Sequence, residues 1–385
     1  MRVCVVYDCL FPYTVGGAER WYRNLAERLA AAGHEVTYLT LRQWDRDERP
    51  ELAGARIVVA GPRMSLYTAS GRRRILPPLV FGLGVLLHLM RNGRRYEVVH
   101  TCSFPYFSLL AAALLRRGAG YRLVVDWHEV WSARYWREYL GPIGGPIGHG
   151  VQRLCARVAQ RAFCFSRLYA QRLRAEGMKG EPTVLEGEYA GSLEVPVASA
   201  ADPVVVFAGR LIPEKRAPLA VAAFAQAAAR VKGLRGELYG DGPERDAVLR
   251  AIADHGVGES LSAPGFVPAS QIDGALRRAM CMLSTSSREG YGMVVVESSA
   301  RATPSVVVAG EDNAATELVE DGVNGFVSPD SDAGAIADAI VRVHEAGIAL
   351  RESTAVWFAQ IAERLSLESS QRTVLASYAT AKARA

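Results

Sequence analysis

The sequence predicts an α/β protein built from two doubly wound domains, each with a parallel sheet. Short apolar runs alternate with helix-like segments along the whole chain, which is the pattern of βαβ units. The runs are almost continuous in Val, Ile and Leu, as in strands that are buried on both faces. The alternation is interrupted near residues 190–203 and then restarts, which indicates two domains.

Each half of the chain has six predicted strands. In the first half they span residues 2–8, 35–41, 55–61, 96–103, 121–129 and 162–166. Residues 19–32 are a predicted helix, because Trp21, Leu25 and Leu29 share one face and Gly33 ends the pattern. In the second half the strands span 203–210, 235–242, 260–267, 280–287, 303–310 and 325–329, with a helix over 218–231.

These patterns predict Rossmann-like domains over residues 1–190 and 204–360, joined by a linker over 191–203 that is rich in small residues. Residues 361–385 are predicted to form a C-terminal helix that returns to the N-terminal domain. The two domains are expected to face each other across a cleft, since ligands of such sheets bind at the carboxyl ends of the strands.

Composition excludes several classes of protein. Hydrophobic residues make up 50% and charged residues 22%, which excludes a disordered chain, and a net charge of +5 without a recognisable motif gives no support for nucleic-acid binding. The six cysteines lie mostly in apolar runs, with no metal-ligand spacing, so we expect buried thiols and no metal. The chain starts with a strand-like run rather than a signal peptide, so a cytoplasmic location is expected.

The segment EGYGMVVVE, residues 289–297, combines two glutamates with a glycine-rich helix start. Gly290 and Gly292 allow a tight turn, and the amides of a helix starting near Met293 favour an anion such as a diphosphate. Glu289 is expected to face the cleft, and Glu297 is placed to accept two hydrogen bonds from the hydroxyls of a ribose. The alternative is an acidic helix start that only suits the helix dipole.

A second segment, FAGRLIPEK at residues 207–215, brings two cations to the same sheet edge. Arg210 ends the first strand of the second domain and Lys215 follows five residues later. Arg offers a forked donor to phosphate oxygens and Lys a point charge. A solvated turn would explain either residue alone, but explains both poorly beside a glycine-rich helix start.

Two features of the N-terminal half also suggest a ligand. Gly16 and Gly17 precede the first long helix, where the backbone can approach a diphosphate, although a loop without ligand explains the pair equally well. His128 ends a strand-like run and therefore lies at a carboxyl edge, although a lone histidine is more often structural.

Together these residues resemble the retaining glycosyltransferases of family four, which have the GT-B fold. The resemblance extends over nearly the whole chain and includes the glycine pair, the GR-x4-K run, the GDGPE turn, the GFV strand, the E-x7-E segment and ATELVEDGVNGFV at residues 315–327. It implies that Arg210 and Lys215 neutralise the donor diphosphate, that Glu297 binds ribose, and that Glu289 and His128 act at the donor sugar. The other implied donor-binding positions are Gly16, Gly17, Gly209, Val267 (at the base), Gly290, Gly292, Met293 and Val294.

The activity that the resemblance implies is transfer of a sugar from a nucleotide-sugar donor, with retention of configuration and without a metal or other cofactor. The acceptor is a glycan, a lipid-linked molecule or a small natural product. The alternatives are a sugar-nucleotide-binding protein without transferase activity and an epimerase-type protein on the same fold. A nicotinamide dehydrogenase would need GxGxxG in the first βα turn, and residues 8–20 hold only one glycine pair.

Residues 72–90 allow two interpretations. Three arginines, Arg72, Arg73 and Arg74, precede a 16-residue apolar segment that is too short for a comfortable transmembrane helix. The segment is either a core helix or an interfacial element at the inner face of the membrane, with the arginines on anionic headgroups.

Overall fold

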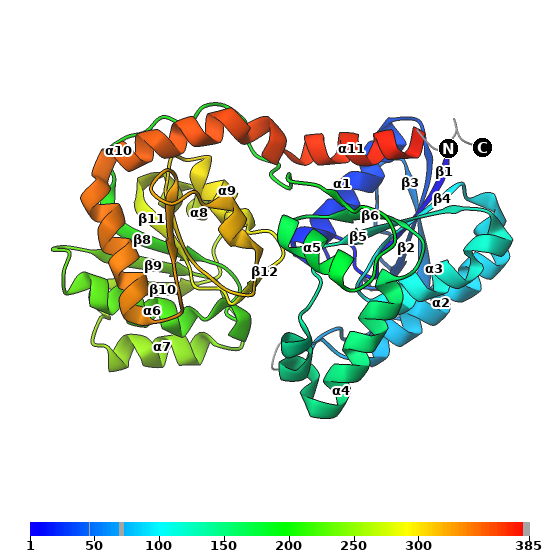
Figure 1. Ribbon diagram of the computed structural model, residues 1–385, viewed down its shortest axis with the longest axis horizontal. Helices are drawn as coiled ribbons and strands as arrows, with labels where there is room; N and C mark the ends of the chain where they lie inside the picture. Colours follow the sequence, from blue (N-terminus) through cyan, green and yellow to red (C-terminus); the bar gives the residue numbers. More distant parts are fainter. Residues whose placement is uncertain (46, 69–72, 380–385) are drawn as a thin grey trace. The chain divides into compact units, whose positions relative to one another are not determined.

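The computed structural model describes residues 1–45, 47–68 and 73–379. They divide into two compact units, of which the first holds the described residues up to Glu188 and those from Ser370 onward, and the second runs from Tyr189 to Ser369. In each unit a parallel sheet is packed between helices (Figure 1). The predicted doubly wound α/β class is confirmed.

The first unit has a seven-stranded sheet in the order β3-β2-β1-β4-β5-β6-β7, in which neighbouring strands run parallel. The chain starts in a central strand and winds outward in both directions, as in nucleotide-binding sheets. The strands are β1 (Arg2–Val6), β2 (Glu35–Leu41), β3 (Ala55–Gly61), β4 (Val98–Cys102), β5 (Arg122–Trp127), β6 (Arg161–Cys164) and β7 (Thr183–Val184). The helices are α1 (Gly17–Ala31), α2 (Leu76–Asn92), η1 (Gly93–Arg95), α3 (Tyr106–Ala119), α4 (Ala133–Ala156) and α5 (Arg167–Ala175).

The second unit has a six-stranded sheet in the order β10-β9-β8-β11-β13-β15, and a separate two-stranded sheet, β12-β14. The strands are β8 (Asp202–Ala208), β9 (Arg235–Tyr239), β10 (Leu261–Gly265), β11 (Ala279–Ser284), β12 (Arg288–Glu289), β13 (Ser305–Val308), β14 (Asp312–Asn313) and β15 (Gly325–Ser328). The helices are η2 (Pro213–Lys215), α6 (Ala217–Ala228), α7 (Arg245–Asp254), α8 (Ala269–Arg278), α9 (Met293–Ser299), η3 (Ala314–Leu318), α10 (Ala333–Leu365) and α11 (Leu367–Ala379), the last of which reaches into the first unit.

The predicted elements differ from the observed ones mainly at their ends. The helix predicted over 19–32 is α1, which starts two residues earlier, and the predicted linker 191–203 overlaps the start of β8 at Asp202. The strands β7, β12 and β14 have two residues each, too few to form a recognisable apolar run. Two short strands that the pattern missed, β12 and β14, carry part of the candidate site.

The end of α11 packs against the sheet of the first unit. The hydroxyl of Tyr378 lies 2.5 Å from Nδ1 of the buried His100 on β4. A guanidinium nitrogen of Arg122 on β5 donates to the Tyr378 carbonyl over 2.8 Å. The last described turn of the chain is therefore part of this unit's core, while the last six residues of the predicted segment 361–385 lie outside the described residues.

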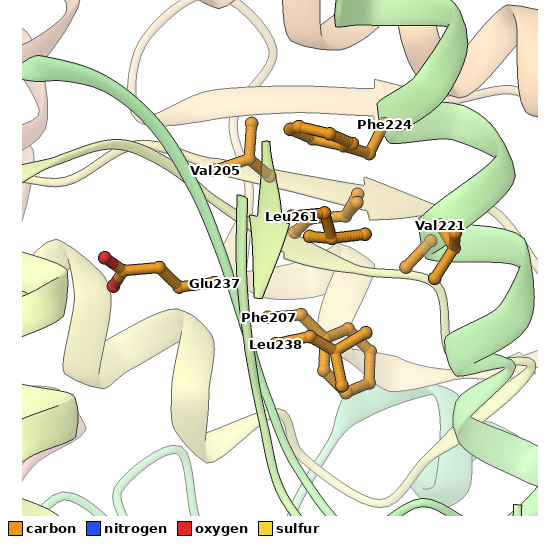
Figure 2. Close-up of a pocket in the computed structure, with 9 residues that line it drawn as sticks. Val205, Phe207, Val221, Phe224, Glu237, Leu238 and Leu261 are labelled. Atoms are coloured by element: carbon orange, nitrogen blue, oxygen red, sulfur yellow. The ribbon is translucent and has the colours of Figure 1, made fainter. Parts of the chain in front are cut away.

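A small void in the second unit belongs to its core. It is lined mainly by apolar side chains of β8, β9 and α6, among them Val205, Phe224 and Leu238. The exception, Glu237, directs its carboxylate away from this apolar cluster (Figure 2) and pairs with Arg278. The lining offers a bound ligand no polar contact, so the void is a packing gap and not the candidate site.

All six cysteines are buried and unpaired. Burial raises the pKa of Cys4 and of Cys281 to about 12, so both remain neutral thiols at physiological pH. None of the helices in the described part of the chain is long and apolar enough to cross a membrane.

Candidate functional site

The loop that carries Lys215 is fixed to the end of β11. The hydroxyl of the buried Thr285 donates to the Lys215 carbonyl over 2.9 Å, and the amide of Ser287 donates to the Glu214 carbonyl over 2.8 Å. These bonds join the segments after β8 and β11, which are neighbours in the sheet. Two predicted site segments that are distant in sequence are thereby held together at the carboxyl edge.

Lys215 and Glu289 form an ion pair in which Nζ lies 2.5 Å from Oε1. The Ser286 hydroxyl donates to the same carboxylate oxygen over 2.7 Å. Burial alone would raise the pKa of Glu289, but the Lys215 ammonium and the Ser286 hydroxyl outweigh it and lower that pKa. Glu289 is therefore a fixed carboxylate at neutral pH.

Sequence reasoning missed Asn313, which holds the strand that carries Glu289. Glu289 on β12 pairs with Asn313 on β14, and the Asn313 side-chain amide donates to the carbonyls of Ser286 (3.1 Å) and Val308 (2.8 Å). Its side-chain oxygen accepts from the Ala315 amide over 3.1 Å. An asparagine close to a glycine in a region without apolar periodicity was the available signal.

Arg210 lies on the same segment after β8 as Lys215, and this part of the segment packs closely on the turn after β9. The amides of Gly209 and Leu211 donate to the carbonyls of Tyr239 (3.0 Å) and Asp241 (2.9 Å). Arg210 is exposed and has no hydrogen-bond or ion-pair partner among the described residues. The backbone contacts fix the loop and leave this guanidinium available to an anion.

Replacing Gly240 with alanine is expected to lower the free energy of unfolding of the second unit by about 2–4 kcal/mol. Its φ is +143°, and a Cβ there would stand 1.8 Å from the Gly209 carbonyl oxygen. The control is Gly274→Ala in α8, where a Cβ meets no atom within 4 Å and alanine is expected to stabilise by up to about 1 kcal/mol. Denaturant unfolding measures both, and equal stability of the two variants would contradict the role given to this turn.

The glycine before α9 is required by the backbone. Gly292 has a φ of +113°, and a Cβ there would lie 2.7 Å from the Ala315 Cβ. Met293 and Val294 follow it, are half-buried and lie in the first turn of α9. Backbone amides in the first turn of a helix have no acceptor within the helix. Glu297 follows one turn later and is also half-buried. Gly290 precedes this turn, and Val267 is buried just after β10.

In the first unit, His128 follows β5 and stacks flat on Phe165, with ring centroids 4.1 Å apart. Its Nδ1 lies 3.6 Å from the Glu188 carboxylate, and its buried Nε2 has no hydrogen-bond partner among the described residues. No pattern in the sequence pairs Glu188 with a residue 60 positions away, because only the return of the chain after β7 brings them together.

Gly16 and Gly17 lie where α1 begins, but Gly17 is the first residue of the helix rather than a residue before it. Gly16 is the extended residue before the helix, and a Cβ there would lie 2.3 Å from a carboxylate oxygen of the buried Glu19. A Cβ at Gly17 would meet no atom within 4 Å. A side chain would therefore collide with Glu19 at Gly16 and would meet open space at Gly17.

Asp126, the acid two positions before His128, belongs to a buried network instead. Its carboxylate lies 2.8 Å from His100 Nε2 and accepts from Trp21 Nε1 over 2.8 Å. Burial would raise the pKa of Asp126, but His100 and the neighbouring donors lower it. The three groups join β4, β5 and α1.

One of the two interpretations of residues 72–90 needs correction at Arg73. The interfacial interpretation places Arg73 on lipid headgroups, but its guanidinium forms an ion pair with the fully buried Asp8 and lies 5.1 Å from the centre of the Phe104 ring. The reason is that the carboxylate after β1 needs a counter-charge in the interior. Arg72 lies outside the described residues. Within the described chain, no three His, Cys, Asp or Glu side chains are grouped as metal ligands.

Comparison with known proteins gives consistent matches over both units. Residues 15–185 match the family model Glycosyltransferase Family 4, and residues 194–355 match Glycosyl transferases group 1. The chain is 30% identical over 366 residues to D-inositol 3-phosphate glycosyltransferase of Acidothermus cellulolyticus, covering 86% of this chain and 79% of that protein. It is 24% identical over 349 residues to alpha-D-kanosaminyltransferase of Streptomyces kanamyceticus, covering 83% and 88%. The structure of Anabaena HepE in complex with UDP-glucose matches with a TM-score of 0.72 and 19% identity, over 99% of this chain and all of that one.

Proposed function

Because this chain belongs to the family-four glycosyltransferases and has their GT-B fold, we propose that it transfers a sugar from a nucleoside-diphosphate sugar to an acceptor with retention of configuration. The observation that carries the proposal is the pairing of Lys215 with Glu289 at a sheet edge where Arg210 is exposed and unpaired among the described residues. Fixed charges of both signs suit a ligand with an anionic diphosphate and a polyhydroxylated sugar.

The proposed roles follow the charges. Arg210 and Lys215 stabilise the diphosphate as it leaves, with the first amides of α9, at Met293 and Val294, beside it. Glu297 holds the ribose hydroxyls, and Glu289 accepts hydrogen bonds from the donor sugar. Gly209, Gly290, Gly292 and Val267 are proposed to line the donor. In the first unit, Gly16, Gly17 and His128 are the proposed donor contacts.

The proposed step is a displacement on one face of the sugar. The acceptor oxygen forms a bond to the anomeric carbon while the bond from that carbon to the diphosphate oxygen breaks, and the electron pair of that bond goes to the diphosphate. A phosphate oxygen of the donor takes the proton of the acceptor hydroxyl. The step needs neither a metal nor a pair of carboxylates at a glycosidase-like separation, and we propose that the enzyme uses no cofactor.

The proposal further places the enzyme in the cytoplasm. Six buried, unpaired thiols fit a reducing compartment. The acceptor is proposed to be a glycan, a lipid-linked molecule or a small natural product.

The test starts with the nucleotide. A thermal-shift screen of UDP, GDP, dTDP and ADP sugars identifies the donor, and calorimetry then compares Glu297→Ala with the parent. Loss of the ribose contact is expected to weaken nucleotide binding about tenfold or more, since hydrogen bonds to a charged group contribute about 1.5–3 kcal/mol. The matched control is Glu345→Ala, an exposed glutamate on α10. Unchanged affinity in Glu297→Ala would remove the ribose role, and binding without transfer or hydrolysis would favour a non-catalytic protein.

A further inference from the structure

The solvent-facing side of α2 is apolar along its length. Before Arg91, every exposed residue of this helix is apolar: Leu76, Leu79, Leu83, Leu87 and Met90, with Ile75 just ahead of the helix. Successive members are three or four residues apart and therefore form one stripe. Leu83 is 57% exposed and Met90 64% exposed. By contrast, the solvent side of α1 is charged, as in a usual surface helix: Arg20 is exposed, and Arg23 and Glu27 are half-buried.

The opposite side of α2 packs closely on β3 and α3. A Cβ at Gly84 would stand 1.6 Å from the Ala60 carbonyl oxygen on β3, and a Cβ at Gly82 would stand 2.5 Å from the Phe107 Cβ on α3. Both glycines let the helix pack tightly on its own unit. The exposed stripe therefore faces solvent, because the helix already packs on its own unit through the opposite side.

Arginines without partners lie at the C-terminal end of the stripe. Arg91 lies in the last turn of α2, and Arg94 and Arg95 follow in η1. All three are exposed, as is Arg117 on the adjoining α3, and none has a hydrogen-bond or ion-pair partner among the described residues. These arginines, and not Arg73, are therefore the exposed cations beside the stripe.

The charge of the surrounding chain is strongly one-sided. Between Glu51 and Asp126 the sequence has eleven arginines and a single acid, Glu97. Because the whole chain carries only +5, the rest of the sequence is net negative. The exposed, unpaired arginines at the end of the apolar stripe match a surface that offers both hydrocarbon and phosphate groups.

We propose that α2 is a membrane-docking surface, in which Ile75, Leu76, Leu79, Leu83, Leu87 and Met90 enter the headgroup–acyl boundary of an anionic bilayer and Arg91, Arg94 and Arg95 contact lipid phosphates. The helix lies flat, because one side is packed on the protein and 17 residues of helix present a stripe about 25 Å long. The docked enzyme thus works beside a lipid surface, whichever acceptor it uses.

The test is flotation of the full chain with vesicles of phosphatidylcholine, with or without about 30 mol % phosphatidylglycerol. The protein is expected to bind the anionic vesicles, and less so at high salt. Two variants are each expected to lower the fraction of protein bound at limiting lipid about tenfold. One is Leu83→Glu, and the other is the triple variant Arg91→Gln, Arg94→Gln and Arg95→Gln. Circular dichroism and thermal unfolding verify that both variants fold.

Matched controls separate docking from general charge and apolarity. Leu249→Glu changes an exposed leucine on α7, and the triple variant Lys232→Gln, Arg235→Gln and Arg250→Gln removes the same charge from exposed positions of the second unit. Both are expected to bind like the parent. No binding of the parent, or equal loss in the control triple variant, would overturn the proposal. If the parent does not bind vesicles but forms a dimer that Leu83→Glu dissociates, the stripe is instead an interface between two copies of the chain.

Discussion

Replacing Lys215 with alanine is expected to lower the turnover number for sugar transfer by about 100- to 1000-fold, the usual effect of removing one group that stabilises charge in a transition state. The proposed reason is that its ammonium meets the diphosphate as negative charge develops there. Steady-state transfer with the donor found in the screen measures the effect. Lys232→Ala, at an exposed lysine of the same unit, is the control and should leave turnover unchanged.

The same substitution has a second, pH-dependent consequence for stability. In the parent the pKa of Glu289 is lowered, so its ionised form stabilises the fold above the unfolded pKa of about 4.3, and this stabilisation is lost as the pH falls through the lower folded pKa. Without the Lys215 ammonium, burial is opposed mainly by Ser286, and the pKa of Glu289 rises. Lys215→Ala is therefore expected to lose more stability at pH 7.5 than at pH 5.

The double variant Lys215→Ala with Glu289→Gln separates the two effects. Removing the buried carboxylate is expected to abolish the pH dependence of the stability loss, while turnover stays low. Normal turnover in Lys215→Ala would refute the diphosphate role. Low turnover together with loss of folded protein in both variants would show that the pair acts on the fold alone.

Asp126→Ala is expected to lower the free energy of unfolding of the first unit by about 3–5 kcal/mol, the cost of breaking a buried ionic pair by removing one partner. The variant removes the carboxylate that pairs with His100 and the acceptor of Trp21 Nε1. His100 also meets Tyr378, so the end of α11 is expected to loosen with it. Hydrogen exchange of the backbone amides in β1, β4 and β5 measures the loss of stability in the first unit.

The pH dependence of this loss has a definite sign. The folded pKa of Asp126 is lowered, so its contribution is complete above the unfolded pKa of about 3.9 and declines as the pH falls through the lower folded value. The difference between parent and variant should therefore shrink in acid. Asp338→Ala, which breaks an exposed ion pair with Arg230, should cost at most about 1 kcal/mol. A loss at Asp126 no larger than that would contradict the network's role.

The strand and helix pattern, and with it the fold class, could be predicted from the sequence alone. Strands buried on both faces are continuous apolar runs, and the glycines at Gly240 and Gly292 indicate turns that other residues would not tolerate. Because parallel strands present their carboxyl ends at one sheet edge, Arg210, Lys215 and Glu289 could also be assigned to that edge from their positions after apolar runs.

The partners of these residues depend on long-range packing. Lys215 touches Glu289, 74 positions away, only because Thr285 and Ser287 tie one loop to the other. His128 lies beside Glu188, 60 positions away, because the chain returns to the end of β5 after β7.

The same limit explains why the interfacial interpretation misplaced Arg73, in the arginine run before α2. Arg73 is one of three adjacent arginines, and periodicity does not show that Asp8, buried after β1, needs Arg73 as its counter-charge. The residue pattern is enough to specify which segments are strands and helices and which edge carries charge. Which charges meet is set by the folded chain, because the free energy of a buried charge depends on the neighbours that the fold brings to it.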